Sequence, residues 1–168
     1  KPGSEGSSIG LSVVMEKGSL KDAIEKAFAY GERIIVEEHI DGREITVGIL
    51  EDKPLPVIEI ITKDKVYDYQ AKYNDPETRY IVPAKIEKGL YEKAQGLGLR
   101  AHTSLGCRCF SRVDMILDGS GDIYVLEVNT IPGMTERSLL PKAASVFGLS
   151  FNQLCVKLIK NAILDKES

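Results

Sequence analysis

Four polar side chains within two apolar runs have the types and spacing of a metal site. Arg112 and Asp114 lie two residues apart in one run, and Glu127 and Asn129 lie two apart in the next. Side chains on a β-strand alternate between its faces, so each pair shares one face. Two carboxylates and an amide oxygen are ligands that Mg²⁺ accepts. The spacing predicts a cation site if two strands bring these faces together.

The segment between the two runs decides whether the faces coincide. Residues 118–122 read Asp-Gly-Ser-Gly-Asp, which is typical of a β-hairpin turn. A four-residue loop at 118–121 or 119–122 pairs even positions of the first strand with odd positions of the second. Paired residues point the same way, so the polar side chains converge. The same face then carries Phe110, Ile116 and Val125. The alternative is a solvated strand face on which Arg112 merely pairs with Glu127.

Two further segments have alternative interpretations. Residues 1–10, Lys-Pro-Gly-Ser-Glu-Gly-Ser-Ser-Ile-Gly, could cradle phosphate through close backbone amides, or be an ordinary Gly/Ser loop. Residues 37–40 end an apolar run and could border a nucleotide or be a solvated strand end.

His39 and His102 lack a nucleophile partner in the sequence, so no Ser/His/Asp triad is predicted. His102 is expected to be structural.

Periodicity predicts a fold of the α+β class, because helices and antiparallel hairpins alternate in blocks. Strands are expected at 11–15, 34–40, 44–50, 56–62, 110–117 and 123–129. Helices are expected at 20–30, 87–105, 138–147 and 151–164. Ser19 is expected to cap the first helix, and Ser150 with Gln153 to form a capping box for the last. Residues 41–43, Asp-Gly-Arg, predict a hairpin turn.

Composition argues against several other classes of protein. The 168 residues are 43% hydrophobic and 28% charged with a net charge of -3, which does not favour nucleic-acid binding. No apolar run approaches the roughly 18 residues of a membrane span, and we expect no signal peptide within these residues. Cys107 and Cys109 would point to opposite strand faces, and Cys155 makes the count odd. We expect ordinary thiols of a reducing cytosol, not a disulfide framework or zinc site.

The motifs together closely resemble the D-alanine–D-alanine ligases, in one order over nearly the whole chain. The matching residues are 1–2, 5–10, 37, 42–47, 67–73, 112–114, 126–130, 132–135 and 138–139. The segment 67–73, Tyr-Asp-Tyr-Gln-Ala-Lys-Tyr, and the Asn-Thr-Ile-Pro-Gly-Met-Thr run from Asn129 are the most specific of these. Position 38 departs from the pattern, because it is Glu where many relatives carry lysine beside the adenine.

The resemblance implies an ATP-grasp fold, with antiparallel sheets and packed helices. Residues 1–36 would be the end of the central subdomain, and 37–168 the C-terminal subdomain with a lid loop at 63–85. The chain begins without methionine in a glycine-rich loop, so we expect a fragment that lacks the N-terminal region. That region supplies the acidic contact to the first D-alanine, so the fragment is expected to be inactive alone. The parent is expected to be a cytoplasmic homodimer.

The resemblance also assigns roles to residues. ATP contacts would come from Lys1, Glu37, Ile40, Glu44, Lys72 and Asn129. Two Mg²⁺ or Mn²⁺ ions would be held by Asp114, Glu127 and Asn129. The first D-alanine would be oriented by Ser7 and Tyr73. The second D-alanine and the tetrahedral intermediate would be bordered by Arg112, Gly133, Ser138 and Leu139.

The implied activity is ATP-dependent joining of two D-alanines through a D-alanyl phosphate, for peptidoglycan precursor synthesis. A D-alanine–D-lactate ligase is the first alternative, and Tyr73 argues against it. D-alanine–D-serine ligation stays open, because it depends on fine shape near Ser138 and Leu139. A third alternative is a non-catalytic nucleotide-binding fragment.

Overall fold

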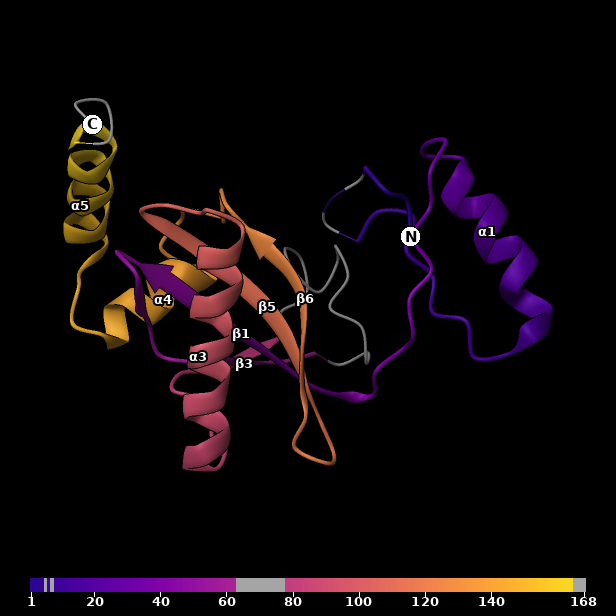
Figure 1. Ribbon diagram of the computed structural model, residues 1–168, viewed down its shortest axis with the longest axis horizontal. Coiled ribbons are helices and arrows are strands. Elements are labelled where there is room, and N and C mark those ends of the chain that lie inside the picture. Colours follow the sequence, from indigo (N-terminus) through magenta and orange to yellow (C-terminus); the bar gives the residue numbers. More distant parts are fainter. Residues whose placement is uncertain (5, 7, 63–77, 165–168) are drawn as a thin grey trace. The chain divides into compact units, whose positions relative to one another are not determined.

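The computed structural model describes residues 1–4, 6, 8–62 and 78–164 (Figure 1). Contacts along the chain divide it into two compact units. The first comprises Lys1–Ile40 and Thr62–Arg79, and the second comprises Asp41–Ile61 and Tyr80–Ser168. Nearly all of the β-sheet belongs to the second unit.

The described residues of the first unit include one short α-helix. A 3-10 turn, η1 (Lys17–Ser19), leads into α1 (Leu20–Phe28). Ser19 does not cap α1 as predicted, because its backbone is already helical and its hydroxyl donates to the Glu16 carbonyl at 2.9 Å. Among the side chains of α1, that of Ala27 is buried.

The strands predicted at 11–15 and 34–40 are absent, although all of these residues are described. An isolated bridge joins Pro2 to Ile34 instead. The predicted hairpin across 41–43 is also wrong, because this segment leads into β1 (Gly42–Leu50), which pairs with strands later in the chain. β-Branched residues favour extended backbone, but a strand forms only where a partner completes its hydrogen bonds.

The second unit is organised around a six-stranded sheet in the order β4-β3-β1-β5-β6, with β2 paired to β1. The strands after β1 are β2 (Lys53–Pro54), β3 (Ile58–Ile61), β4 (Arg79–Ile81), β5 (Phe110–Asp118) and β6 (Ile123–Asn129). The loop expected to run to residue 85 ends earlier, because β4 joins the sheet and the Ala84 amide donates to the Val57 carbonyl at 2.8 Å.

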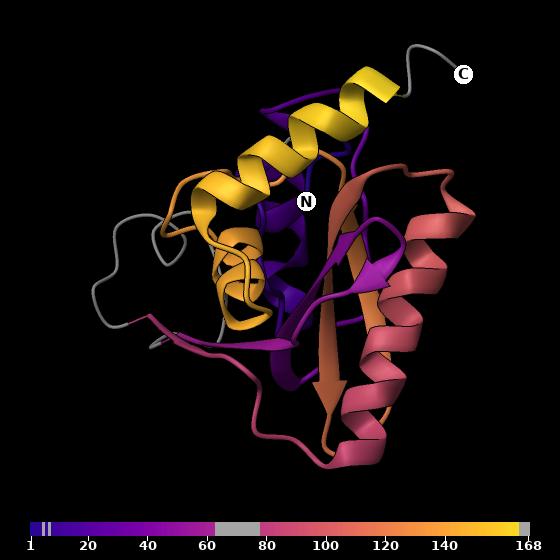
Figure 2. The same ribbon diagram turned by 90° about the vertical axis from the view of Figure 1, so that its left-hand side faces the viewer.

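Helices cover both faces of this sheet, as Figure 2 shows. α3 (Lys88–Ser104) packs on one face, and α4 (Leu139–Val146) and α5 (Phe151–Leu164) lie on the other. The core beneath α3 includes Ile45, Val47, Ile49, Val113, Met115 and Leu117. A Cβ at Gly98 would lie 3.1 Å from the Val47 Cβ, so this glycine lets α3 approach the sheet closely. The predicted helix is confirmed, and its glycines do not interrupt it.

On the opposite face of the sheet, α4 packs against β1 near the end that contains Gly48. A Cβ at Gly48 would lie 2.6 Å from the Leu140 Cδ1, so any larger residue here would force the Leu140 side chain of α4 to shift. The predicted capping box of α5 is confirmed: the Ser150 amide donates to Gln153 Oε1 at 2.8 Å, and the Gln153 amide donates to the Ser150 hydroxyl at 3.3 Å.

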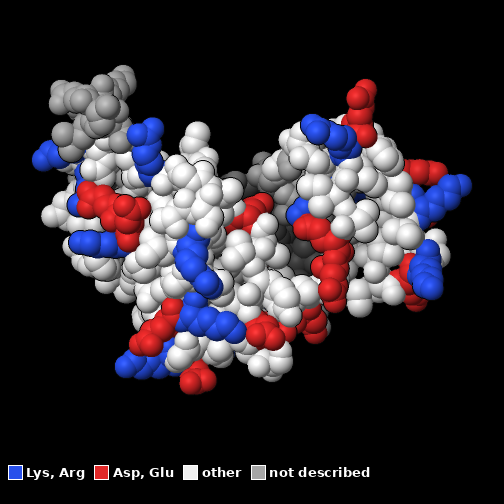
Figure 3. All heavy atoms as spheres, viewed as in Figure 1, with Lys and Arg blue, Asp and Glu red and all other residues white. Residues whose placement is uncertain are grey.

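The surface carries both charge signs interspersed over the face shown in Figure 3. On this face the charges do not gather into a basic patch of the kind that nucleic-acid binding uses. Within the described residues, no helix combines the length and apolarity needed to cross a membrane. Cys107, Cys109 and Cys155, all described, form no disulfide.

Candidate cation and phosphoryl-transfer site

Residues 119–122 lie between β5 and β6, which is one of the two four-residue loops expected. The register beside the turn differs from the prediction, because Leu117 pairs with Ile123 and odd positions therefore match odd positions. The Asp118 amide donates to the Asp122 carbonyl at 2.9 Å, and Gly121 has a positive φ of 90°. The Asp118 carboxylate accepts from the Ser120 hydroxyl at 2.8 Å and from nearby backbone amides, which lowers its pKa. This loop sets Met115 opposite Val125, so Val125 does not share the predicted polar face.

A β-bulge restores the expected pairing further along the hairpin. Met115 opposes Val125, but Asp114 opposes Glu127, so Leu126 is left without a partner in the register. Arg112 then opposes Asn129. One extra residue in a strand moves the side chains beyond it to the opposite face of the sheet. The side chains of Glu127 and Asn129 therefore share a face with those of Arg112 and Asp114, as predicted. The predicted convergence is confirmed, although it comes from the bulge and not from the register expected beside the turn.

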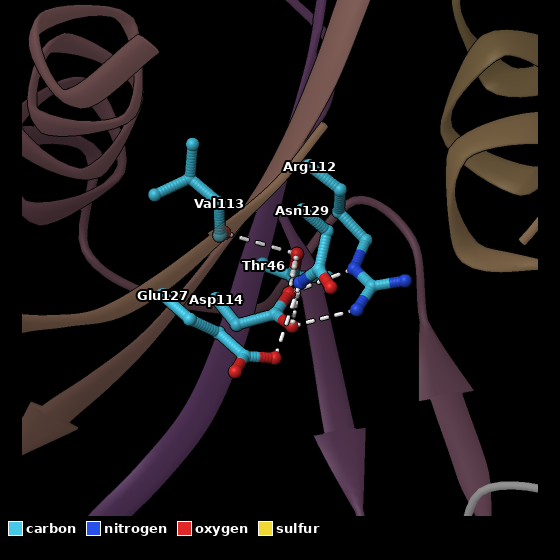
Figure 4. Close-up of polar contacts among 6 residues, drawn as sticks. All are labelled: Thr46, Arg112, Val113, Asp114, Glu127 and Asn129. Atoms are coloured by element: carbon cyan, nitrogen blue, oxygen red, sulfur yellow. Dashed lines mark hydrogen bonds and ion pairs between the residues drawn. The ribbon is translucent and has the colours of Figure 1, made fainter. Parts of the chain in front are cut away.

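Five side chains form what we call the Asp114 group: Thr46, Arg112, Asp114, Glu127 and Asn129. Figure 4 shows their polar ends meeting, while Val113 points away. Arg112 Nε donates to Asp114 Oδ1 at 2.8 Å, and its Nη2 donates to Oδ2 at 2.7 Å. Arg112 therefore forms a bidentate pair with Asp114, whereas the alternative predicted from the sequence was a pair with Glu127.

Asp114 accepts four hydrogen bonds, two on each carboxylate oxygen. Besides the two from Arg112, the Thr46 hydroxyl donates to Oδ1 at 2.6 Å and Asn129 Nδ2 donates to Oδ2 at 3.0 Å. These bonds occupy the roughly four acceptor positions of an ionised carboxylate. Asp114 is 8% exposed, so the contacts replace most of its hydration.

Asn129 lies between the two carboxylates. Its Nδ2 is 3.0 Å from Asp114 Oδ2 and 3.2 Å from Glu127 Oε1, where it supplies partial positive charge to both. Rotation of the amide would exchange this nitrogen for its oxygen, which is a hard donor. Two carboxylates and this amide therefore fit a Mg²⁺ ion by donor type. Within the described ranges, no cluster of three or more His, Cys, Asp or Glu forms an alternative site.

The predicted residues after β6 lie close together. A Cβ at Gly133 would be 3.0 Å from the Ser138 Oγ. Ser138 Oγ accepts from the Thr135 amide at 3.0 Å rather than capping α4. Leu139, the first residue of α4, is buried.

The predicted ATP contacts are described only in part. Lys1 Nζ forms an ion pair with Glu37 and donates to its Oε2 at 3.1 Å, so these two meet within the first unit. Ile40 is half-buried, and Glu44 is half-buried on the strand that carries Thr46. Ser7, Lys72 and Tyr73 lie outside the described residues.

His102 is structural, as the sequence suggested. It is 0% exposed, and its Nδ1 lies 2.7 Å from the Ser111 Oγ. Burial lowers its pKa, and the Asp52 carboxylate 3.6 Å from Nε2 opposes this only in part. The imidazole is therefore favoured in its neutral form.

Thr46 is the site residue that the role assignments missed. It belongs to the motif at 42–47, but no role was given to it. Its signal was present in the sequence, because it is polar and follows Glu44 at the strand period of two within an apolar run.

Comparison with known proteins gives the family. Residues 1–160 match the family described as D-ala D-ala ligase C-terminus. The chain belongs to this family. It is 49% identical over 165 residues to a D-alanine–D-alanine ligase of Pelobacter propionicus, covering 98% of this chain and 53% of that protein. A ligase of the same name from Citrifermentans bemidjiense is 44% identical over 164 residues, covering 98% and 54%. The chain thus spans about half the length of the relatives it matches.

Solved structures give the same result. A D-alanine–D-alanine ligase from Bacillus anthracis complexed with ATP matches with a TM-score of 0.83 and 31% identity, over 99% of this chain and 52% of that one. The VanG D-Ala:D-Ser ligase from Enterococcus faecalis matches with a TM-score of 0.79 and 39% identity, over 92% and 46%. These neighbours confirm the predicted α+β, ATP-grasp fold class.

Proposed function

We propose that this chain provides the cation-binding and phosphoryl-transfer part of a D-alanine–D-alanine ligase. The observation that carries the proposal is the Asp114 group, where two carboxylates share one sheet face with a single guanidinium and are linked through Asn129. One negative charge in the group is unbalanced, and like charges this close favour a bound cation. The family membership supports the choice of reaction.

The residues that would hold Mg²⁺ or Mn²⁺ are Asp114, Glu127 and Asn129. A bound cation would offset negative charge on the transferring phosphoryl group. ATP is the proposed nucleotide, supported by the B. anthracis ligase complexed with ATP. Lys1 would contact its phosphates, and Glu37, Ile40 and Glu44 its adenosine, while 1–36 and 37–168 would serve as two ATP-grasp subdomains.

The proposed reaction has two steps. A carboxylate oxygen of the first D-alanine attacks the γ-phosphorus of ATP, the bond to the bridging oxygen breaks, and ADP leaves. The amine of the second D-alanine then attacks the acyl carbon of D-alanyl phosphate, loses a proton, and phosphate leaves. The product would serve peptidoglycan precursor synthesis, in the cytoplasm where ATP is available.

The chain's own residues would stabilise the oxyanion of the second step. Arg112 has a guanidinium on the polar sheet face, and Gly133, an exposed residue, could donate through its backbone amide. Preorganised donors of this kind often supply the largest part of catalysis in acyl transfer. The segment 63–77, with Lys72 and Tyr73, would cover the acyl phosphate against water.

D-Serine is the second candidate for the second substrate. The similarity to the VanG D-Ala:D-Ser ligase favours this alternative specifically. Both substrates would meet the same Gly133–Ser138 segment, so the difference between them would be one hydroxyl. The two candidates share the first step and differ only in the second.

The test is a chimaeric ligase in which this chain replaces the matching part of the P. propionicus enzyme. We expect ATP-dependent phosphate release with D-alanine, and lower release when D-serine or D-lactate is the second substrate. The unaltered relative is the positive control, and the chain alone should bind Mg²⁺ without turnover. A folded chimaera with no D-alanine-dependent phosphate release would rule out the proposed function.

A further inference from the structure

Thr46 occupies a buried position directly opposite Asp114. The two residues are cross-strand partners between β1 and β5, and Thr46 is 1% exposed. Its hydroxyl is 2.6 Å from Asp114 Oδ1 and 3.0 Å from the Val113 carbonyl oxygen. Because a hydroxyl has one hydrogen, the shorter contact identifies the carboxylate as its main acceptor.

The two oxygens of Asp114 have different surroundings. Oδ1 accepts from Thr46 and Arg112, whereas Oδ2 accepts from Arg112 and Asn129, beside Glu127. The contact with Thr46 lies on the buried side, so water cannot readily replace it. It therefore keeps Oδ2 turned toward Asn129 and Glu127, which are the other two candidate ligands.

We propose that Thr46 is a positioning residue for the cation site, which acts by holding the Asp114 carboxylate through Oδ1. This inference rests on the proposed function, which assigns a divalent cation to Asp114 and Glu127. Outer contacts of this kind orient a metal's ligands, and losing one typically weakens binding about 10- to 100-fold. The role belongs to a side chain that would not touch the cation or the substrates.

The test is Mn²⁺ binding to the 168-residue chain, measured by titration calorimetry and by the electron paramagnetic resonance of free Mn²⁺. Thr46→Val keeps the branched shape suited to a strand but removes the donor. We expect its Mn²⁺ dissociation constant to rise about tenfold. Thr46→Ser restores the hydroxyl and should restore affinity. If Thr46→Val does not fold, Thr46→Ala replaces it, with the same expectation.

Ser111→Ala is the matched control. Ser111 also has a fully buried hydroxyl on β5, but this hydroxyl contacts His102. Both variants should lower the thermal midpoint, whereas only Thr46→Val should weaken Mn²⁺ binding. An equal loss of affinity in Ser111→Ala would show a general structural effect and overturn the inference.

Two further outcomes separate this inference from the function on which it rests. If Asp114→Asn abolishes Mn²⁺ binding but Thr46→Val binds like the wild type, the positioning role fails and the cation site stands. If the wild type and Asp114→Asn bind Mn²⁺ equally, the cation assignment fails, and the role of Thr46 fails with it. Failure of Thr46→Ser to recover affinity would also overturn the role of the hydroxyl.

Discussion

Two arginine–carboxylate pairs in the same sheet have nearly the same geometry. Arg112 contacts Asp114 through two hydrogen bonds of 2.8 and 2.7 Å. Arg43 contacts Glu59 through two hydrogen bonds of 2.7 Å each. Both are bidentate, the arrangement in which a guanidinium matches a carboxylate best. Geometry alone therefore does not separate a structural pair from a functional one.

The surroundings of the two pairs differ. Arg43 also donates to the Lys85 carbonyl at 3.0 Å, and its contact with Glu59 raises its pKa, so it stays charged. The Arg43–Glu59 pair balances one charge with one charge. The Arg112–Asp114 pair lies beside a second carboxylate, Glu127, which leaves the group negative. The net charge around each pair therefore distinguishes a structural pair from a functional one, whereas the hydrogen-bond distances within the pair do not.

The largest expected effect is a loss of phosphate release when the Asp114 group is altered. Asp114→Ala or Glu127→Ala should reduce Mg²⁺-dependent phosphate release by the chimaeric ligase at least a hundredfold, because each removes a candidate ligand. Glu92→Ala, which removes an exposed carboxylate on α3, should leave the rate unchanged. Near-normal turnover in either site variant would break the comparison, because the extra carboxylate would then have no function.

The Arg43–Glu59 pair should affect stability instead. Arg43→Ala leaves the Glu59 carboxylate, 9% exposed, without its main partner. We expect a loss of about 2 kcal/mol in urea unfolding, below the range for fully buried pairs because Arg43 is 43% exposed. The Mn²⁺ affinity should not change, and Arg100→Ala on α3 should alter neither quantity. A large loss of affinity in Arg43→Ala would contradict a purely structural pair.

The smallest effect is a pH dependence of stability from His102, which shares the α3 side of the sheet. Burial lowers its folded-state pKa below the unfolded value of about 6.5, so acid protonates the unfolded chain first. Stability should be complete above about pH 6.5 and fall as the pH decreases from there toward the folded-state pKa. Unfolding measured from pH 7.5 to 5.5 should show this slope. His102→Gln should remove it, and His39→Ala should keep it.

The sequence predicted the second unit better than the first. The strands at β1, β3, β5 and β6 and all three described helices of the second unit were expected, because each has a clear apolar period. The segment 34–40 has the same β-branched character but no strand. Its β-branched residues favour an extended backbone locally, but strand formation also depends on pairing partners elsewhere in the chain.

At the site, the sequence predicted the convergence of Arg112, Asp114, Glu127 and Asn129. It did not predict the bulge at Leu126 that produces it, because neither the register at the turn nor the extra residue has a unique local signal. Thr46 was missed for a related reason. Its importance comes from lying opposite Asp114, and cross-strand neighbours depend on a pairing between residues far apart in the chain.

Because of the bulge at Leu126, the residue pairing near the turn of the β5–β6 hairpin does not fix the residue pairing at the Asp114 group. The loop and the pairs 115–125, 116–124 and 117–123 follow one register, and the pairs 112–129 and 114–127 follow another. A one-residue change of loop length during evolution can therefore be cancelled by gain or loss of the bulge. The ligand positions would keep their partners while the turn diverges. Alignments of such hairpins are best anchored on Asp114 and Glu127 and not on the turn.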